Sequence, residues 1–294
     1  MATQTQSNDV LKVRAELDAE VEGKTIGDIL LRNATEHGDR PVLILKENGG
    51  WGRLTWSEYR QRVAEAAMGF ASLGVEHGDF VAIMARNRPE HLVADLGAVH
   101  AGATGVSIYN SLAPEQIAYI GGHCEAKVAV VEDREFMERW EKVKSDLPAL
   151  EHVVLMEGAD EFSDYEWVLS WDELIRRGKE ALAKDPEAFE RMWREVKPDD
   201  PATLVYTSGT TGPPKAVNIT HRNILWTAAS IAKVWPLPVG MRGVSYLPLA
   251  HIAERMITHY LGLWFVGFGG MSPELAQVTE IVGEVRPDVF LGVP

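Results

Sequence analysis

Apolar and polar positions in the first part of the chain follow the period of a helix before any strand pattern begins. The residues from Thr55 to Glu58 fit a capping box, and apolar residues then recur at steps of three and four. These apolar positions are Tyr59, Val63, Ala66, Phe70 and Leu73. Gly74 follows at the place of a helix C-cap. The pattern predicts an amphipathic helix that starts after Thr55 and ends at Gly74.

Short apolar runs and helical segments alternate after this helix. Strands are predicted over residues 80–84, 103–108, 127–131 and 152–156, and helices over residues 89–101, 114–124, 135–145 and 171–183. Alternation with short connections is typical of βαβ units. We therefore expect a doubly wound α/β fold whose sheets are mainly parallel and covered by helices on both faces.

The helix predicted over residues 114–124 contains two unusual glycines. Pro114 suits its first turn, and Ile117 and Ile120 are expected to face inward. Gly121 and Gly122 carry a high entropy cost in a helix, so they should shorten or loosen it.

The chain divides by composition into three parts. Residues 1–20 form a polar N-terminal tail, residues 21–197 the α/β front part, and residues 198–294 the part with the most distinctive motifs. Residues 160–164 and 185–200 are charge-rich connectors, and the second places a subdomain boundary near Lys197. Residues 289–293 read as a buried strand with nothing beyond it, so we expect a protein interrupted at its end.

Residues 204–215 read Leu-Val-Tyr-Thr-Ser-Gly-Thr-Thr-Gly-Pro-Pro-Lys, a strand followed by a hydroxyl-rich glycine turn and a lysine. Glycines allow a close backbone approach, so successive N–H groups can point at an anion. The hydroxyls add donors, and Lys215 adds a mobile positive charge. The candidate phosphate-binding residues are Thr207, Ser208, Gly209, Thr210, Thr211, Gly212 and Lys215.

A P-loop is the obvious competing interpretation of this segment. That motif needs a glycine immediately before its lysine and a helix immediately after it. Here Pro214 takes the place of that glycine, and residues 216–219 read as another strand. A P-loop is therefore rejected, and a simple polar hairpin turn is disfavoured by the density of glycines and hydroxyls.

A second motif, Leu-Pro-Leu-Ala-His-Ile-Ala-Glu-Arg, spans residues 247–255. A histidine beside apolar residues is often only a core residue, but the upstream phosphate motif favours a site role for His251. Glu254 and Arg255 are adjacent opposite charges, and a functional and a structural role both stay open for them.

Residues 204–215 match the AMP-binding signature of adenylate-forming enzymes, the superfamily of acyl-CoA synthetases, luciferases and peptide-synthetase adenylation domains. Residues 247–255, together with residues 106–120, resemble long-chain fatty acyl-CoA synthetases in particular. The resemblance covers about residues 25–294. It implies that the loop binds the β- and γ-phosphates of ATP, that His251 lines the site of the acyl carboxylate, and that Glu254 borders the active site.

For the intact enzyme, the resemblance implies a long-chain fatty acid–CoA ligase. A fatty acid attacks the α-phosphate of Mg²⁺-bound ATP to give acyl-AMP and pyrophosphate, and coenzyme A then displaces AMP. Catalytic roles are expected for Lys215, His251 and Glu254. The family's adenine-, ribose- and metal-binding motifs would lie beyond Pro294, so no metal ligand is assigned. We expect this 294-residue chain to bind nucleotide phosphates weakly and to be inactive alone.

Two other function classes stay open. Another adenylate-forming ligase, for an aryl or amino acid, would share the phosphate motif but not the form of residues 247–255. A non-catalytic nucleotide-binding module is the second alternative.

Composition adds limits to these interpretations. Residues 201–294 hold six Lys or Arg against five Asp or Glu, so the first 200 residues carry −15 of a net charge of −14, which argues against nucleic-acid binding. The single cysteine, Cys124, excludes an internal disulfide and suits a reducing, cytoplasmic compartment, with burial as its expected role. No apolar run is long enough to span a bilayer. Residues 260–271 are expected to be core, with peripheral membrane contact as the lesser alternative, and no protein partner is predicted.

Overall fold

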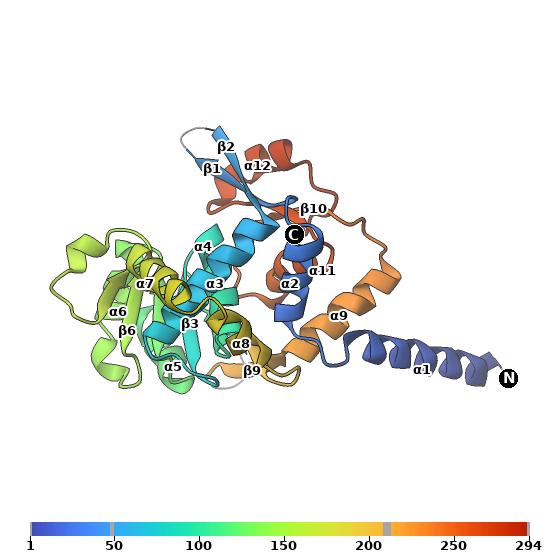
Figure 1. Cartoon of the computed structure of the whole chain (residues 1–294), viewed down its shortest axis with the longest axis horizontal. Helices are drawn as coiled ribbons and strands as arrows, with labels where there is room; N and C mark the ends of the chain where they lie inside the picture. Colours follow the sequence, from blue (N-terminus) through green and yellow to red (C-terminus); the bar gives the residue numbers. More distant parts are fainter. Residues whose placement is uncertain (1, 48–49, 208–212, 293–294) are drawn as a thin grey trace.

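Two β-sheets and the helices around them make up the protein (Figure 1). The computed structural model describes residues 2–47, 50–207 and 213–292 of the 294-residue chain. The larger sheet lies on the left in Figure 1, and the N-terminal helix extends from the opposite side. The α/β prediction with mainly parallel sheets is confirmed.

The larger sheet has the strand order β7-β6-β5-β3-β4-β8-β9. All neighbours in it are parallel except β8 and β9, which are antiparallel. The strands are β3 (Phe80–Met84), β4 (Thr104–Ser107), β5 (Val128–Val131), β6 (His152–Leu155), β7 (Val168–Ser170), β8 (Pro201–Thr207) and β9 (Lys215–Thr220). The chain leaves β3 in two directions along the sheet, as expected for a doubly wound fold.

Helices cover both faces of this sheet because alternate side chains of each strand point to opposite sides. Val81 and Ile83 of β3 pack with the helices of one face, and Ala82 and Met84 pack with those of the other. The first face carries α3 (Trp56–Ser72), α4 (Pro89–His100) and α7 (Trp171–Lys184), and the second carries α5 (Pro114–His123) and α6 (Arg134–Glu141). The apolar runs of the sequence are therefore strands buried on both sides.

The smaller sheet has the order β10-β11-β1-β2 and joins distant parts of the chain. Its strands are β1 (Pro41–Glu47), β2 (Gly50–Thr55), β10 (Arg242–Ser245) and β11 (Phe268–Met271). Around it lie α2 (Ile26–Glu36), α9 (His221–Val234), α11 (Leu261–Trp264) and α12 (Val278–Val285). Because β1 pairs with β11, the N-terminal region helps to build the part that carries the second motif.

The remaining elements are short, apart from the N-terminal helix. They are α1 (Ala2–Val21), α8 (Ala188–Arg194), α10 (Ile252–Glu254), three 3₁₀ turns, η1 (Lys144–Asp146), η2 (Ala159–Phe162) and η4 (Leu275–Gln277), and a π-helical turn, η3 (Arg255–Tyr260). Residues 2–20, expected as a polar tail, thus belong to a helix, and Leu17 on its inner side is buried.

The helix predicted after Thr55 is confirmed in detail. Thr55 Oγ1 accepts a hydrogen bond from Glu58 N at 3.3 Å, and the Glu58 carboxylate accepts one from Thr55 N at 2.9 Å. Gly74 has φ +82°, the left-handed conformation of a residue that ends a helix. Both ends of α3 could therefore be predicted from local sequence.

Three predicted segments are wrong in detail. The connector at residues 185–200 contains α8, because Phe189 and Trp193, four residues apart, bury one face of it. The helix predicted over residues 135–145 ends as α6 at Glu141 and continues only as η1. Residues 289–292 do not form the predicted strand: Val289 makes a single parallel bridge to Gly243, and the neighbouring Phe290 stacks on Tyr246 instead.

Of the prediction that Gly121 and Gly122 shorten or loosen helix α5, the shortening is wrong. The helix runs to His123. A Cβ at Gly121 would lie 3.2 Å from a methyl carbon of Leu147, so the missing side chain lets η1 and α5 pack closely. The packing offsets the entropy cost on which the prediction rested.

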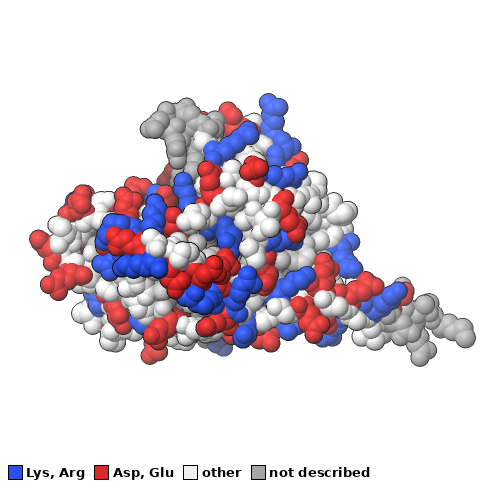
Figure 2. Space-filling model, in the orientation of Figure 1, with Lys and Arg blue, Asp and Glu red and all other residues white. Residues whose placement is uncertain are grey.

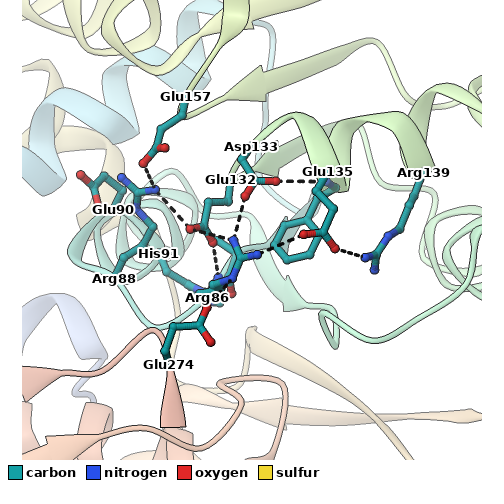
Figure 3. A network of polar contacts seen from close by, with 12 residues as sticks. Arg86, Arg88, Glu90, His91, Glu132, Asp133, Glu135, Arg139, Glu157 and Glu274 are labelled. Carbon is teal, nitrogen blue, oxygen red and sulfur yellow. Dashed lines mark hydrogen bonds and ion pairs between the residues drawn. The ribbon is translucent and has the colours of Figure 1, made fainter. Parts of the chain in front are cut away.

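A network of charged side chains lies at the carboxyl ends of β3, β5 and β6 (Figure 3). Arg86 contacts Glu132 and Asp133, which follow β5, and its Nε lies 3.4 Å from Glu274 Oε1. Glu274 lies just after the smaller sheet's strand β11. The network therefore ties the two sheets together at this edge. Nearby acidic partners offset the desolvation of Arg86, so its pKa is raised.

Charged residues of both signs are interspersed over the face shown in Figure 2. This face carries no continuous basic surface of the kind that nucleic acids require. Within the described ranges, no helix combines the length and apolar character that a membrane span needs. Tyr260, Leu261 and Leu263 are buried, so the prediction of a core role for this segment is confirmed.

Candidate functional site

The phosphate-loop prediction falls partly outside the described part of the chain. This is the case for Ser208, Gly209, Thr210, Thr211 and Gly212. The two remaining residues of the prediction, Thr207 and Lys215, face each other. They are the last pair of the antiparallel β8–β9 ladder, and both are exposed. The sheet thus holds a hydroxyl and an ammonium group side by side at its end.

A cavity of about 470 Å³ opens beside Thr207, and we call it the Thr207 cavity. Residues from four separate segments line it: Tyr109, Leu112, Gln116, Ile120, Val205, Tyr206, Thr207, Pro214, His251 and Ile252. It therefore brings the end of the phosphate motif and the predicted His251 to the same space. Thr207 and His251 are 44 residues apart in the sequence (251 − 207), and only the fold brings them together.

His251 is exposed at this cavity and caps the short helix α10. Its Nδ1 accepts a hydrogen bond from Ala253 N at 3.1 Å. A neutral imidazole that accepts at Nδ1 carries its proton on Nε2. His251 can therefore donate from Nε2 to an oxygen atom of a ligand.

Glu254, the third residue with an expected catalytic role, lies in a different environment. It is fully buried, and burial raises the pKa of its carboxyl group. Thr258 Oγ1 donates to Glu254 Oε1 at 2.9 Å. Glu254 is not among the residues that line the Thr207 cavity, so its carboxylate does not reach a ligand there.

Arg255 is also buried, and its partner is Asp95 of α4 rather than the adjacent Glu254. Its guanidinium also donates to Ser107 Oγ at 2.6 Å and to Tyr260 Oη at 2.9 Å. Asp95 in turn lies 3.3 Å from His259 Nε2. The second motif is therefore fixed to α4 and to strand β4 of the larger sheet through buried polar and charged groups.

A second cavity lies between the smaller sheet and the helices that follow His251. It is small, about 50 Å³, and we call it the glycine-lined cavity. Its lining is Val42, Leu43, Trp56, Tyr59, Leu92, Met241, Gly243, Ser245, Ile257, Thr258, His259, Gly262, Leu263, Gly267, Phe268, Gly269, Gly270, Met271, Val289 and Leu291. Most of these side chains are apolar or absent, so the cavity suits a hydrocarbon group.

One short segment links the two cavities. Ile252 lines the Thr207 cavity, and Ile257 and Thr258, about one π-helical turn further on, line the glycine-lined cavity. A polar group in the first cavity and an apolar chain in the second would therefore contact the same stretch of residues.

The sequence analysis missed Asp95 and the glycines of the second cavity as site residues. Asp95 reads as one more polar residue in a helical pattern, and only the fold shows that it is buried. The glycines had a visible signal, because Gly262, Gly267, Gly269 and Gly270 crowd into nine residues of an otherwise apolar stretch. Such crowding next to a site motif indicates space for a ligand.

The described residues contain no cluster of three or more histidine, cysteine, aspartate or glutamate side chains suited to a metal ion. Carboxylates are also absent from the lining of the Thr207 cavity. These residues therefore do not fit a resident magnesium ion.

Residues 30–294 match the family described as AMP-binding enzyme. Among curated relatives, the chain is 33% identical to the long-chain-fatty-acid–CoA ligase ACSBG2 of Xenopus laevis, with 98% of this chain and 40% of that protein covered. It is 32% identical to the long-chain-fatty-acid–CoA ligase heimdall of Drosophila melanogaster, with 99% and 44% covered. The chain thus spans less than half the length of these relatives.

Solved structures agree on the fold. The N-terminal domain of FACL13 from Mycobacterium tuberculosis superposes with a TM-score of 0.74 at 24% identity, over 92% of this chain and 63% of that one. The anthranilate CoA ligase AuaEII, in complex with anthranoyl-AMP, superposes with a TM-score of 0.76 at 23% identity, over 91% of this chain and 49% of that one. At these identities the similarity concerns the fold alone.

Proposed function

This chain belongs to the AMP-binding enzyme family, and from that membership we propose that it forms the phosphate- and acyl-binding part of an ATP-dependent long-chain fatty acid–CoA ligase. In the first half-reaction a fatty acid carboxylate attacks the α-phosphate of ATP, and pyrophosphate leaves. In the second, the thiol of coenzyme A attacks the acyl carbon, and AMP leaves.

The observation that carries this proposal is the shared space of Thr207, Pro214 and His251. Lys215, paired with Thr207, brings a positive charge to the edge of this space. The first half-reaction brings a carboxylate onto a polyphosphate, so its barrier comes largely from charge and position. Lys215 offsets phosphate charge, and the Nε2–H of His251 orients an oxygen of the carboxylate or the phosphate.

The glycine-lined cavity is our candidate for the acyl chain. At about 50 Å³ it holds only a few water-sized groups, so a long chain requires lining side chains to move. Met241 and Met271 are in the lining, and methionine adapts readily because it is unbranched and flexible. The printed names of the relatives favour a long-chain acid, whereas an aryl or amino acid is the competing substrate class.

In this proposal coenzyme A is a substrate, and magnesium accompanies the substrate ATP. Magnesium would arrive bound to ATP, since the described residues offer no cluster to hold it. Glu254 is proposed to act indirectly, by holding the turn that carries His251, because its carboxylate is buried away from both cavities.

We also propose peripheral membrane contact at the end of α9. Val234 is 87% exposed, and Trp235 and Val239 are about half exposed. Residues 234–241 carry no charged side chain, and Met241, at the end of this stretch, lines the glycine-lined cavity. Apolar and tryptophan side chains in such a position favour a membrane interface. Trp235→Ser should reduce cosedimentation with phosphatidylcholine vesicles, and unchanged cosedimentation would contradict this contact.

ATP binding and turnover test the proposal separately. The first measurement is the dissociation constant of Mg²⁺-ATP for this chain and for Lys215→Met, with Lys233→Met as a control lysine whose ammonium contacts Glu16. The second is fatty-acid-dependent AMP formation by this chain and by any longer product of the same reading frame. We expect this chain to bind ATP without turnover and the longer product to turn over.

Three results would contradict the proposal in different ways. Absence of ATP binding would reject the phosphate site. Turnover of the longer product only with aryl or amino acids would reject the long-chain substrate. Binding without any turnover in a longer product would favour a non-catalytic nucleotide-binding module.

A further inference from the structure

Helix α5 contacts the chain on both sides of the connection between β8 and β9, once before the connection begins and once where it ends. Tyr119 Oη donates a hydrogen bond to the carbonyl oxygen of Pro214 at 2.9 Å. One turn further along the helix, His123 Nδ1 lies 2.9 Å from Tyr206 Oη. Tyr206 directly precedes Thr207, and Pro214 directly precedes Lys215. Two side chains of one helix therefore hold the two positions from which the phosphate-site residues extend.

The three rings of this contact form one cluster. His123 lies between the others, with ring centroids 5.8 Å from Tyr119 and 5.6 Å from Tyr206. Tyr206 is also within 3.5 Å of the carbonyl oxygen of Ile120, on the same helix. The cluster thus joins β8 to α5 by ring packing and by hydrogen bonds together.

The end of the connection, at Pro213 and Pro214, leads into a strand that, within the described sheet, is hydrogen-bonded on one side only. Strand β9 is at the edge of the larger sheet, and among the described strands β8 alone pairs with it. Val217 on β9 is 45% exposed, and Pro213 and Pro214 have no N–H to donate. An edge strand is hydrogen-bonded on one side only, so a contact from outside the ladder adds to what holds its first residues. Tyr119 supplies that outside contact.

We propose that Tyr119 and His123 are positioning residues for nucleotide binding. They hold Pro214 and Tyr206 so that Thr207 and Lys215 stay paired and face the same phosphate group. This inference rests on the proposed function and extends it to helix α5, which lies outside the phosphate motif. Because each residue acts through a hydrogen bond, loss of one should weaken ATP binding by about three- to tenfold.

The test uses substitutions that remove the hydrogen-bonding group and leave an aromatic ring at the position: Tyr119→Phe keeps the phenyl ring, and His123→Phe replaces the imidazole with a ring that cannot hydrogen-bond. Tyr119→Phe loses the contact to Pro214, and His123→Phe loses the contact to Tyr206. Tyr165→Phe is the matched control, because its hydroxyl contacts Glu141 far from the connection. The dissociation constant of Mg²⁺-ATP should rise about three- to tenfold in the first two variants and stay within about twofold in the control. The urea midpoint of unfolding should be the same in all of them.

A second measurement does not depend on the nucleotide. Amide hydrogen exchange in the β8–β9 ladder, followed without ATP, should be faster in Tyr119→Phe and His123→Phe and unchanged in Tyr165→Phe. If the parent chain binds ATP and both variants bind it equally well, the positioning role is rejected. If the parent does not bind ATP, the proposed function fails, and unchanged exchange in the variants would reject the anchoring as well.

Discussion

Arg255 Nη2 donates to Asp95 Oδ1 at 2.5 Å, and both side chains are only 1% exposed. The two residues come from η3 and α4, so their contact joins the segment after His251 to the helix that packs on the larger sheet. A buried pair of this kind adds little beyond what an apolar pair would, but removal of one partner leaves the other charge buried and uncompensated.

Asp95→Asn should therefore destabilise the protein strongly. We expect a loss of about 3–5 kcal/mol in the free energy of unfolding, because Arg255 keeps its charge without a counter-ion. Urea unfolding followed by tryptophan fluorescence measures the change. Arg134→Met is the control: Arg134 pairs with Glu138 and Glu161 on the surface, where solvent screens the pairs, so its loss should cost far less than the loss of Asp95. Equal effects of the two substitutions would contradict the argument.

Gly262 is expected to set the space in the glycine-lined cavity. A Cβ at this position would meet no atom within 4 Å, so a larger side chain can enter the open space. Gly262→Leu should weaken binding of a fluorescent C16 fatty acid about tenfold or more and leave ATP binding unchanged, since a filled cavity excludes the chain.

Gly283→Leu is the matched control for this change. Gly283 also has open space around its Cβ position, but it is exposed on α12 and does not line the cavity. Fatty acid binding should be the same as in the parent chain. If Gly262→Leu binds the fatty acid as the parent does, the acyl chain lies elsewhere.

Gly178 is expected to be essential for the packing of α7 on α3. A Cβ there would lie 1.7 Å from the backbone oxygen of Glu65, which side-chain motion does not relieve. Gly178→Ala should cost several kcal/mol of unfolding free energy, with about 3 kcal/mol as the expected scale for overpacking. Gly122→Ala on α5, where the Cβ has ordinary contact only, should be neutral or stabilise by up to about 1 kcal/mol. Thermal unfolding of both variants distinguishes them.

Stability should fall between about pH 6.5 and pH 4 because of buried histidines. Burial lowers the pKa of His91, His100 and His221 to about 4, from an ordinary value of 6.5. In this range the unfolded chain binds protons that the folded chain excludes, so each histidine lowers the unfolding free energy by about 1.4 kcal/mol per pH unit. Glu254, with a raised pKa, works in the opposite direction at the acid end of the range.

His221→Asn tests this origin of the pH dependence. His221 Nδ1 accepts a hydrogen bond from Ile26 N at 3.1 Å, and an asparagine oxygen can replace that acceptor without titrating. The slope of unfolding free energy against pH should become shallower between pH 6.5 and pH 4 by about 1.4 kcal/mol per pH unit, the contribution of one proton. An unchanged slope would mean that His221 is not among the groups responsible.

Local sequence predicted those parts of the fold in which short-range chemistry decides the outcome. The cap at Thr55 and the left-handed Gly74 are examples, and both depend only on neighbours along the chain. The parallel strands were also predictable, because burial on two faces leaves continuous apolar runs such as residues 80–84.

The rest depended on long-range packing. Gly121 is accommodated in α5 because Leu147 packs against it, and β1 pairs with β11, which is more than 200 residues away in the sequence. The motifs identified Thr207 and His251 separately, but their common cavity, and the contact of Tyr119 with Pro214, required the fold. Asp95 carried no sequence signal, since its importance comes from its buried contacts with Arg255 and His259.

The π-helical turn at Arg255–Tyr260 has an evolutionary implication. Such a turn lets a helix absorb one additional residue while the helical segments on either side keep their direction. A lineage could therefore gain or lose a single codon here and alter which side chains reach the glycine-lined cavity, without rebuilding its surroundings.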